Sequence, residues 1–252
     1  MSRLSAVIIT YNEERNIRRC LESLQGIADE ILVVDSYSSD QTEVICREFD
    51  VRFIQNIFAG HIEQKNFAMK QAKYDLILSL DADEALSPEL QQSIRSITDR
   101  SGDTAYSFNR LTNYCRKWIH HCGWYPDTKT RLWDRRRGKW GGTNPHDKVI
   151  LHDDVDVSRL NGDLYHYSFY TVEEHMRQID YFTDISSKAA YENGKWSNVL
   201  KLIVKPAFKF FRDYILKLGI LDGYYGFIIC KNSTYAKYLK YKKLMDLQNQ
   251  SD

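Results

Sequence analysis

Three acidic residues follow directly on a short apolar segment, and their types and spacing are suited to binding a cation. Residues 76–80 are apolar except for one serine, and Asp81, Asp83 and Glu84 come next. An apolar run of this length is typical of a strand buried on both faces of a parallel sheet. Ligands of open α/β sheets bind at the carboxyl ends of the strands, so we expect these carboxylates to face a ligand.

A divalent cation is the ligand that this acidic pattern favours. Two carboxylates one residue apart can converge on a hard cation, which takes oxygen ligands from the protein and from substrate phosphates. The alternative is structural, with Asp83 or Glu84 serving only to open a turn where the strand ends.

The elements that must position these acids alternate between strand and helix over the first hundred residues. Expected strands cover residues 6–9, 31–34, 51–54 and 76–80, and a helix is expected after each of them. Asn12 predicts an N-cap for the first helix, residues 40–43 a capping box for the second, and Ser87 with Pro88 the start of the fourth. The alternation predicts an α/β fold whose parallel sheet is built from right-handed crossovers.

The second expected strand also ends in an acid, Asp35. The carboxyl ends of parallel strands lie along one edge, so Asp35 and Asp81 should face the same ligand. The chain has no glycine-rich dinucleotide fingerprint and no Walker loop, which argues against a dinucleotide-binding Rossmann domain and a P-loop NTPase. Without a glycine cradle, a metal must hold any phosphates.

Composition narrows the class further. A chain of 252 residues accommodates one large α/β domain or one domain with an appendage, and its net charge of +1 gives no reason to expect a nucleic-acid partner. The five cysteines are scattered and odd in number, which favours a reducing cytosol. No signal peptide and no membrane-spanning run is recognised, so we expect a cytoplasmic protein.

Three motifs together resemble the family 2 glycosyltransferases of the GT-A fold. They are residues 6–13, residues 31–36 with Ser38, Asp40 and Thr42, and residues 81–83. Within that family the chain is most similar to enzymes that add a sugar to lipopolysaccharide or lipooligosaccharide core. The residues that carry this finer similarity are Gln64, Asn66, Arg131, Leu132, Trp133, Asn144, Pro145, His146, Asp147, Tyr165, His166, Tyr167, Leu221, Asp222 and Gly223. The resemblance implies a GT-A, Rossmann-like, mostly parallel sheet flanked by helices, with a C-terminal helical extension.

The resemblance also implies roles for individual residues. The nucleotide-sugar would be bound by Thr10, Glu13, Asp35, Gln64, Asn66, Asp81 and Arg131, with Arg131 clamping the diphosphate. Asp83, assisted by Asp81, would hold Mg2+ or Mn2+ on that diphosphate. His166 either completes the metal shell or is an interior histidine.

A sugar hydroxyl is a poor nucleophile and needs a base. The resemblance places this base at Asp147, after the pair Gly141 and Gly142, where close relatives commonly carry the longer glutamate. One base opposite the leaving diphosphate implies inversion at the anomeric carbon. The alternative is a structural pair of His146 and Asp147 in a loop.

The C-terminal part of the chain is basic. We expect a catalytic domain over residues 1–170, with a nucleotide-sugar half (1–100) and an acceptor half (101–170), and a helical extension over 171–252. Lys201, Lys205, Lys209 and Arg212 fall on one helix face near Phe208 and Phe211. Basic amphipathic helices rich in aromatics lie on anionic bilayers, so we expect a peripheral protein on the cytosolic face of the inner membrane. The alternative is a helix that packs on the catalytic domain.

These observations predict a metal-dependent, inverting glycosyltransferase. It would move a sugar from a nucleoside-diphosphate sugar, a UDP-hexose, to a cell-envelope glycolipid or polysaccharide such as lipopolysaccharide core. Transfer to a polyprenyl phosphate is the alternative within the fold, since that acceptor is already an anion. A nucleotidyltransferase or a non-catalytic membrane-binding module are the alternatives of another class.

Overall fold

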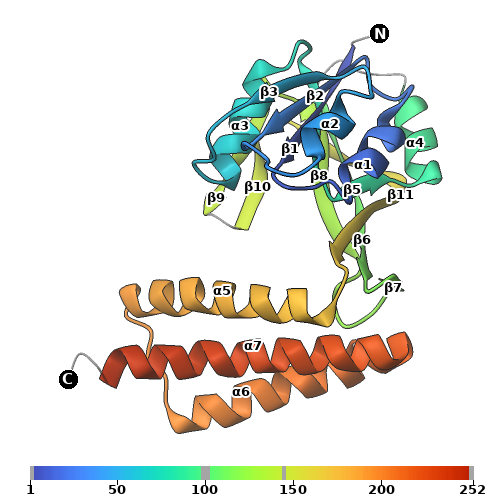
Figure 1. Cartoon of the computed structure of the whole chain (residues 1–252). Coiled ribbons are helices and arrows are strands. Elements are labelled where there is room, and N and C mark those ends of the chain that lie inside the picture. Colours follow the sequence, from blue (N-terminus) through green and yellow to red (C-terminus); the bar gives the residue numbers. More distant parts are fainter. Residues whose placement is uncertain (1–2, 98–102, 144–145, 250–252) are drawn as a thin grey trace. The chain divides into compact units, whose positions relative to one another are not determined.

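The computed structural model describes residues 3–97, 103–143 and 146–249 (Figure 1). Residues 144 and 145 of the predicted base motif lie outside these ranges. The chain divides into two compact units. The first holds Met1–Arg110 and Asp127–Tyr167, and the second holds Leu111–Pro126 and Ser168–Asp252. The second unit therefore contains the segment 111–126 in addition to the expected C-terminal extension.

The first unit is built on a twisted sheet whose first four strands are parallel. In spatial order they are β3 (Arg52–Gln55), β2 (Glu30–Asp35), β1 (Leu4–Thr10) and β4 (Leu76–Asp81). The sheet continues from β4 through β8 (Asp127–Asp134), β6 (Thr104–Tyr114), β11 (Asp156–Phe169) and β5 (Glu84–Leu86). The antiparallel pair β4–β8 joins the two halves, and the predicted α/β fold is confirmed.

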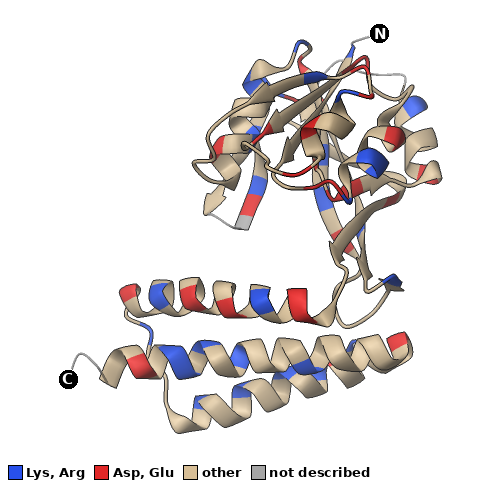
Figure 2. Cartoon of the chain, viewed as in Figure 1, with Lys and Arg blue, Asp and Glu red and all other residues tan. Residues whose placement is uncertain are grey.

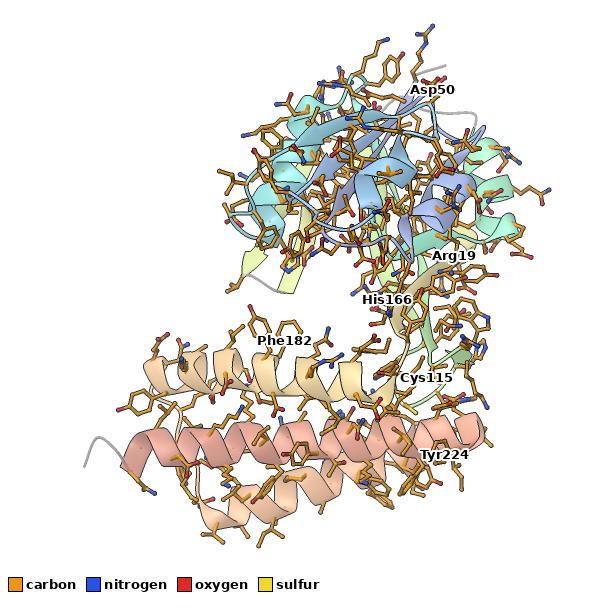
Figure 3. All side chains as sticks on the ribbon, in the orientation of Figure 1. Arg19, Asp50, Cys115, His166, Phe182 and Tyr224 are labelled. Carbon is orange, nitrogen blue, oxygen red and sulfur yellow. The ribbon has the colours of Figure 1, made fainter. Side chains whose placement is uncertain are left out.

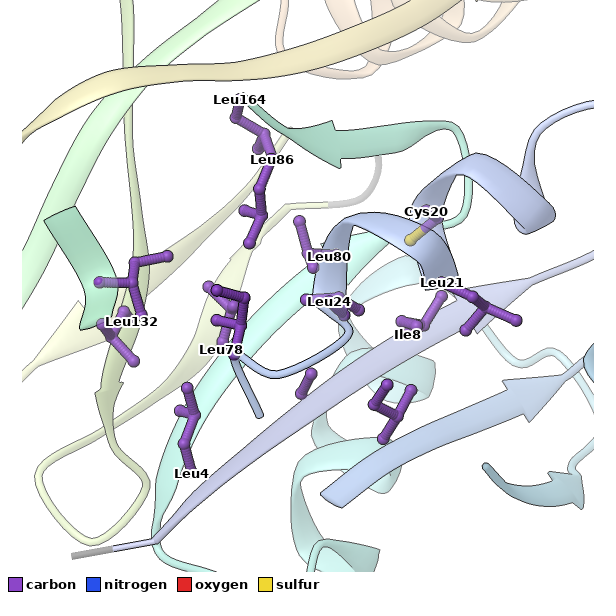
Figure 4. Close-up of a cluster of buried hydrophobic side chains, with 14 of the residues drawn as sticks. Leu4, Ile8, Cys20, Leu21, Leu24, Leu78, Leu80, Leu86, Leu132 and Leu164 are labelled. Carbon is purple, nitrogen blue, oxygen red and sulfur yellow. The ribbon is translucent and has the colours of Figure 1, made fainter. Parts of the chain in front are cut away.

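Helices cover both faces of the parallel strands. Alternate residues of a strand point to opposite faces, which is why Ile8 packs with Leu21 in one core cluster and Val7 packs with Ala68 in the other. The helices of the first cluster are α1 (Ile17–Leu24), α2 (Thr42–Cys46) and α4 (Pro88–Arg95), and that of the second is α3 (His61–Gln71). Figure 4 shows the first cluster, in which Leu78 and Leu80 of β4 are fully buried.

One of the three expected helix starts is confirmed. The hydroxyl of Ser87 accepts a hydrogen bond from the backbone N–H of Leu90, and Pro88 opens α4. Asn12 is not an N-cap, because it occupies a left-handed turn (φ 54°) and its side chain accepts a bond from Ser39 N; α1 begins five residues later.

The second helix, α2 (Thr42–Cys46), begins where expected but without a capping box. Asp40 Oδ1 accepts from Thr42 N, whereas Glu43 pairs with Arg47 rather than returning to the cap. The reciprocal arrangement is found instead at Thr171 and Glu174.

A hairpin completes the first unit. Its strands, β9 (Gly138–Thr143) and β10 (His146–Leu151), are antiparallel, and their register places Asp147 opposite Gly142. The hairpin is attached to α3 by Asn66, whose side-chain amide donates to Trp140 O and accepts from Trp140 N. This attachment determines where Asp147 lies.

The second unit is helical. It contains β7 (Lys117–Ile119), α5 (Val172–Glu192), α6 (Val199–Phe211) and α7 (Gly223–Asn249), with the short turns η1 (Arg212–Leu216) and η2 (Gly219–Asp222) between the last two helices. In its core, Tyr114 Oη lies 3.0 Å from His175 Nδ1, and burial lowers the pKa of His175 to about 4. Among the described residues no helix is both long and apolar enough to cross a membrane.

Candidate active site

The polar residues expected to bind a nucleotide-sugar meet at one edge of the parallel sheet. Strand β1 lies between β2 and β4, with Thr10 level with Asp35 and Ile9 level with Asp81. The three strand ends are therefore neighbours, which confirms the prediction that their acids share one edge.

Asp83 and His166 are brought together from distant parts of the chain. Asp83 lies in the turn between β4 and β5, and β5 pairs with β11 so that Glu84 is level with His166. The Nε2 of His166 is 3.2 Å from Asp83 Oδ2, and Tyr167 N donates to Asp83 O at 2.9 Å. Both side chains are partly exposed, and Figure 3 shows His166 at this edge of the first unit.

This pair fits a divalent cation that arrives with its substrate. Among the described residues no group of three or more His, Cys, Asp or Glu side chains is placed to hold a metal. Mg2+ is commonly bound by one or two protein ligands, with substrate phosphates and water filling the other positions. A carboxylate beside an imidazole at a partly exposed strand end provides such an incomplete set.

A buried lysine links the expected metal side of the site to the expected base. Lys65 Nζ lies 2.9 Å from Asp81 Oδ1 and 2.8 Å from Asp147 Oδ2, and its side chain is 4% exposed. The ammonium also lies 4.5 Å from the ring centre of Trp140. The side chain of Asp147 is therefore held at the strand ends, and Lys65 is the residue that holds it there.

The sequence prediction missed Lys65, although a signal for it was present. Lys65, Ala68 and Met69 follow the i, i+3, i+4 spacing of one helix face, and all three are buried. A lysine on the buried face of a helix requires a charged partner, because an unpaired buried charge is costly. Its two partners, Asp81 and Asp147, lie 16 and 82 residues away, so only the tertiary fold identifies them.

A second ion cluster lies beside the first. Arg131 Nη2 is 2.9 Å from Glu84 Oε1 and 3.3 Å from Asp81 Oδ2, and Arg110 Nη1 lies 3.6 Å from the same Glu84 oxygen. Burial alone would raise the pKa of Asp81, but the charges of Lys65 and Arg131 outweigh it and hold that pKa below its usual range. Asp81 is therefore ionised and already engaged by two cations.

The pKa of Glu13 is shifted upward, opposite to that of Asp81. Burial and then the neighbouring charge of Asp83 raise the pKa of Glu13 to about 7, against the hydrogen bond that it accepts from Asn16. At neutral pH this carboxyl is thus partly protonated next to the expected metal ligand, and a positive charge arriving there would favour its ionised form.

The remaining predicted residues are built into the loops that shape the site. Asp35 is fully buried and accepts from the backbone N–H of Ser38. Gln64 donates to Ser36 Oγ and accepts from Asn56, so it ties the loops after β2 and β3 together. Thr10 is buried, and its hydroxyl has no partner among the described residues.

The first unit is thus an α/β fold whose parallel strands end in acids along one edge. Residues 5–156 match the family model described as Glycosyl transferase family 2. The chain therefore belongs to glycosyltransferase family 2.

Curated relatives agree with that membership. An uncharacterised glycosyltransferase of Rickettsia bellii is 30% identical, over 98% of this chain and 88% of that protein. The lipopolysaccharide core biosynthesis glycosyltransferase LpsC of Rhizobium meliloti is 26% identical, over 96% of this chain and 91% of that protein. Among solved structures, S. aureus TarS has a TM-score of 0.49 at 15% identity, covering 94% of this chain and 55% of that chain.

Proposed function

We propose that the protein is a metal-dependent, inverting glycosyltransferase that moves a hexose from a UDP-sugar to a glycolipid or polysaccharide of the cell envelope. The observation that carries this proposal is the strand edge where Asp83 lies 3.2 Å from His166 and Lys65 binds both Asp81 and Asp147. The similarity to LpsC supports lipopolysaccharide core as the acceptor class.

Asp83 and His166 would hold Mg2+ or Mn2+, with Asp81 close behind them. When bound, the cation stabilises the negative charge that develops on the departing diphosphate. Thr10, Glu13 and Asp35 would line the nucleotide pocket from the ends of β1 and β2. The hydroxyl of Thr10, buried without a partner among the described residues, is a group that a nucleotide would satisfy.

Asp147 would act as the general base. Its carboxylate takes the proton of the acceptor hydroxyl, the hydroxyl oxygen bonds to the anomeric carbon, and the bond from that carbon to the diphosphate oxygen breaks. Attack from the side opposite the diphosphate inverts the anomeric configuration. Lys65 would position Asp147 for this step, and a positioned general base contributes about 10²–10⁴-fold.

Arg131 would have two roles, because it holds two carboxylates of the protein and would also bind the diphosphate. Its Nη2 is bound by Glu84 and Asp81, so part of the guanidinium serves to hold those carboxylates. Its Nε and Nη1 are buried without a partner among the described residues. These two groups are the donors through which Arg131 would bind a diphosphate, since guanidinium matches phosphate oxygens.

The acceptor would be met at the cytosolic face of the inner membrane, with the second unit on the anionic bilayer. A polyprenyl phosphate remains the alternative acceptor, and Asp147 would then be dispensable as a base because the nucleophile is already an anion. Full activity of an Asp147→Asn variant would select this alternative.

A donor screen tests the proposal. The purified chain is mixed with individual nucleoside-diphosphate sugars in Mn2+ or in EDTA, and its thermal unfolding is followed. We expect one UDP-hexose to raise the unfolding temperature in Mn2+ and to have little effect in EDTA or on an Asp83→Ala variant. Stabilisation by no nucleotide-sugar, or equal stabilisation with and without metal, would contradict the proposal.

A further inference from the structure

Helix α6 and the turn η1 that follows it carry an exposed apolar stripe, called here the α6 stripe. Leu200, Ile203, Val204, Phe208, Phe211 and Ile215 have exposed fractions between 44% and 67%. Exposed leucine and phenylalanine side chains scattered singly are ordinary, but a continuous apolar surface of this extent marks an interaction site. Nothing in the described part of the second unit covers it.

The stripe is one of three sectors around this helix. At about 100° per residue, the five apolar residues of the stripe that belong to α6 fall on one side of that helix. The side toward α7 contains Pro206, which is buried, and Phe210, which is partly buried and whose ring contacts Phe227 of α7. The third sector contains Lys201, Lys205 and Lys209 (Figure 2). The apolar stripe is therefore bordered along one margin by lysines.

The basic margin is weaker than the sequence alone indicates. Lys209 and Arg212 both form ion pairs with Asp213, which is buried, so these three residues together contribute about one positive charge. Lys201 lies 3.4 Å from the ring centre of Trp196, an exposed tryptophan at the start of the stripe. Lys205 is exposed at the centre of the margin.

We propose that the α6 stripe inserts into the headgroup–acyl boundary of an anionic bilayer, with Lys201 and Lys205 at the level of the lipid phosphates. An apolar helix face with a basic margin and aromatic side chains has the complementary chemistry for that boundary. Insertion of apolar side chains, rather than attraction of four free charges, supplies most of the binding. α6 lies in the plane of the membrane.

This surface extends the proposed function, since it rests on the idea that the sugar acceptor is a lipid, but it can be measured without turnover. Binding to vesicles that persists at high salt distinguishes insertion of apolar side chains from attraction between lysines and lipid phosphates. At 1 M salt the Debye length is about 3 Å, which suppresses exposed charge attraction but leaves apolar insertion intact. We therefore expect a substantial part of the binding to anionic vesicles to persist at high salt.

The experiment is co-sedimentation of the full chain with phosphatidylcholine vesicles, with and without phosphatidylglycerol. The double substitution Phe208→Asn with Phe211→Asn should lower the partition coefficient by about 100-fold in low and high salt. Lys205→Gln should lower it only a few-fold, and only in low salt. Tyr181→Asn on α5 is the matched control, an equally exposed aromatic of the same unit that should change nothing.

Three outcomes would overturn the proposal. They are wild-type-like binding by the double variant, complete loss of wild-type binding at high salt, and no vesicle binding by the wild type. If light scattering then shows a dimer that the double variant loses, the occupant of the stripe is a second copy of the chain. Donor-dependent thermal stabilisation in the double variant shows that it is folded, and keeps a failure of docking distinct from a failure of the proposed transfer.

Discussion

In the first unit, charged side chains are buried at the strand ends, whereas in the second unit apolar side chains are exposed along α6. Lys65, Glu84 and Arg131 are almost inaccessible, while Leu200 and Phe208 are more than half exposed. Each arrangement reverses the usual distribution, in which apolar groups are buried and charges are solvated. Burying charges and exposing apolar side chains both raise the free energy of the folded protein. We take each as the mark of a binding surface, for substrate in the first unit and for a membrane in the second.

The two reversals differ in how they are compensated. The buried charges around Lys65 and Arg131 compensate one another, because Asp81, Asp147 and Glu84 each lie within 3.3 Å of a cation. The exposed stripe of the second unit has no such compensation among the described residues. A network of paired charges holds catalytic groups in place, whereas an uncovered apolar face requires a partner surface. We therefore assign catalysis to the first unit and docking to the second unit.

Loss of Asp83 is expected to have the largest effect. Asp83→Ala should lower transfer by at least about 10³-fold in saturating donor, since the charge of the leaving diphosphate loses its counterion. It should also weaken binding of the nucleotide-sugar in Mn2+, measured by titration calorimetry. Asp153→Ala, a change at an exposed acid of the same unit, is the control. Near-normal transfer by Asp83→Ala would show that Asp83 does not hold a metal that the reaction needs.

Asp147→Asn should affect the chemical step alone. The amide keeps the shape of the side chain but cannot take a proton, so kcat should fall by about 10²–10⁴-fold while donor affinity changes little. Steady-state rates and donor titration measure the two quantities separately. A collapse of donor affinity would instead place Asp147 in the nucleotide site.

Lys65→Met tests whether the buried charges act as one network. It leaves Asp81 and Asp147 without their shared cation, so we expect the free energy of unfolding to fall by about 3–5 kcal/mol. The loss should be greatest at neutral pH. Because the folded state holds the pKa of Asp81 below its usual 3.8, the stabilising pair exists above that pH and disappears as Asp81 is protonated.

The effect of Lys65→Met on kcat shows whether Lys65 positions Asp147 for catalysis or only stabilises the fold. In conditions where the variant is folded, kcat should fall by about 10–10²-fold with a smaller change in donor affinity. Lys65→Arg keeps the charge and should recover part of both losses. If Lys65→Met is less stable but has a normal kcat, Lys65 is a structural residue only.

Glu13→Gln should give the smallest effect. It concerns the pH dependence of the free energy of unfolding, which has the opposite sign for Glu13 and for Asp81. The folded state raises the pKa of Glu13 from 4.5 to about 7, so it binds a proton that the unfolded state has released. Wild-type stability therefore decreases as pH rises from about 4.5 to 7, by up to about 3 kcal/mol. The glutamine cannot ionise, so the variant should lack this decrease. Urea unfolding in EDTA at pH 5 and pH 8 measures the difference.

Much of the first unit was predictable because its signals are local. Residues 76–80 and the two β-branched runs before them indicate buried parallel strands, and Ser87 with Pro88 specifies a helix start. Asn12 was misread because a left-handed turn and an N-cap favour the same residue type. The placement of Asp35 and Asp81 along one edge followed from the rule that parallel strands end on the same side of a sheet.

The ion network around Lys65 was not predictable from the sequence. Lys65 meets Asp147 only because Asn66 attaches the β9–β10 hairpin to α3, a contact across 74 residues. This pairing depends on tertiary distances, which no local pattern contains. The pairing of Lys209 and Arg212 with Asp213 is different, because it joins residues that are four positions apart or adjacent in the sequence, and the helical turn that continues through η1 brings them together.

The most direct test of the account is the initial rate at which the purified wild-type chain releases nucleoside diphosphate from its donor in the presence of a truncated lipopolysaccharide core acceptor. We predict release that requires acceptor and Mn2+ or Mg2+, stops in EDTA, and falls with Asp147→Asn, with the product inverted at the anomeric carbon. Release that proceeds equally in EDTA and in the Asp83→Ala and Asp147→Asn variants would contradict the assignment of the strand edge as the catalytic site.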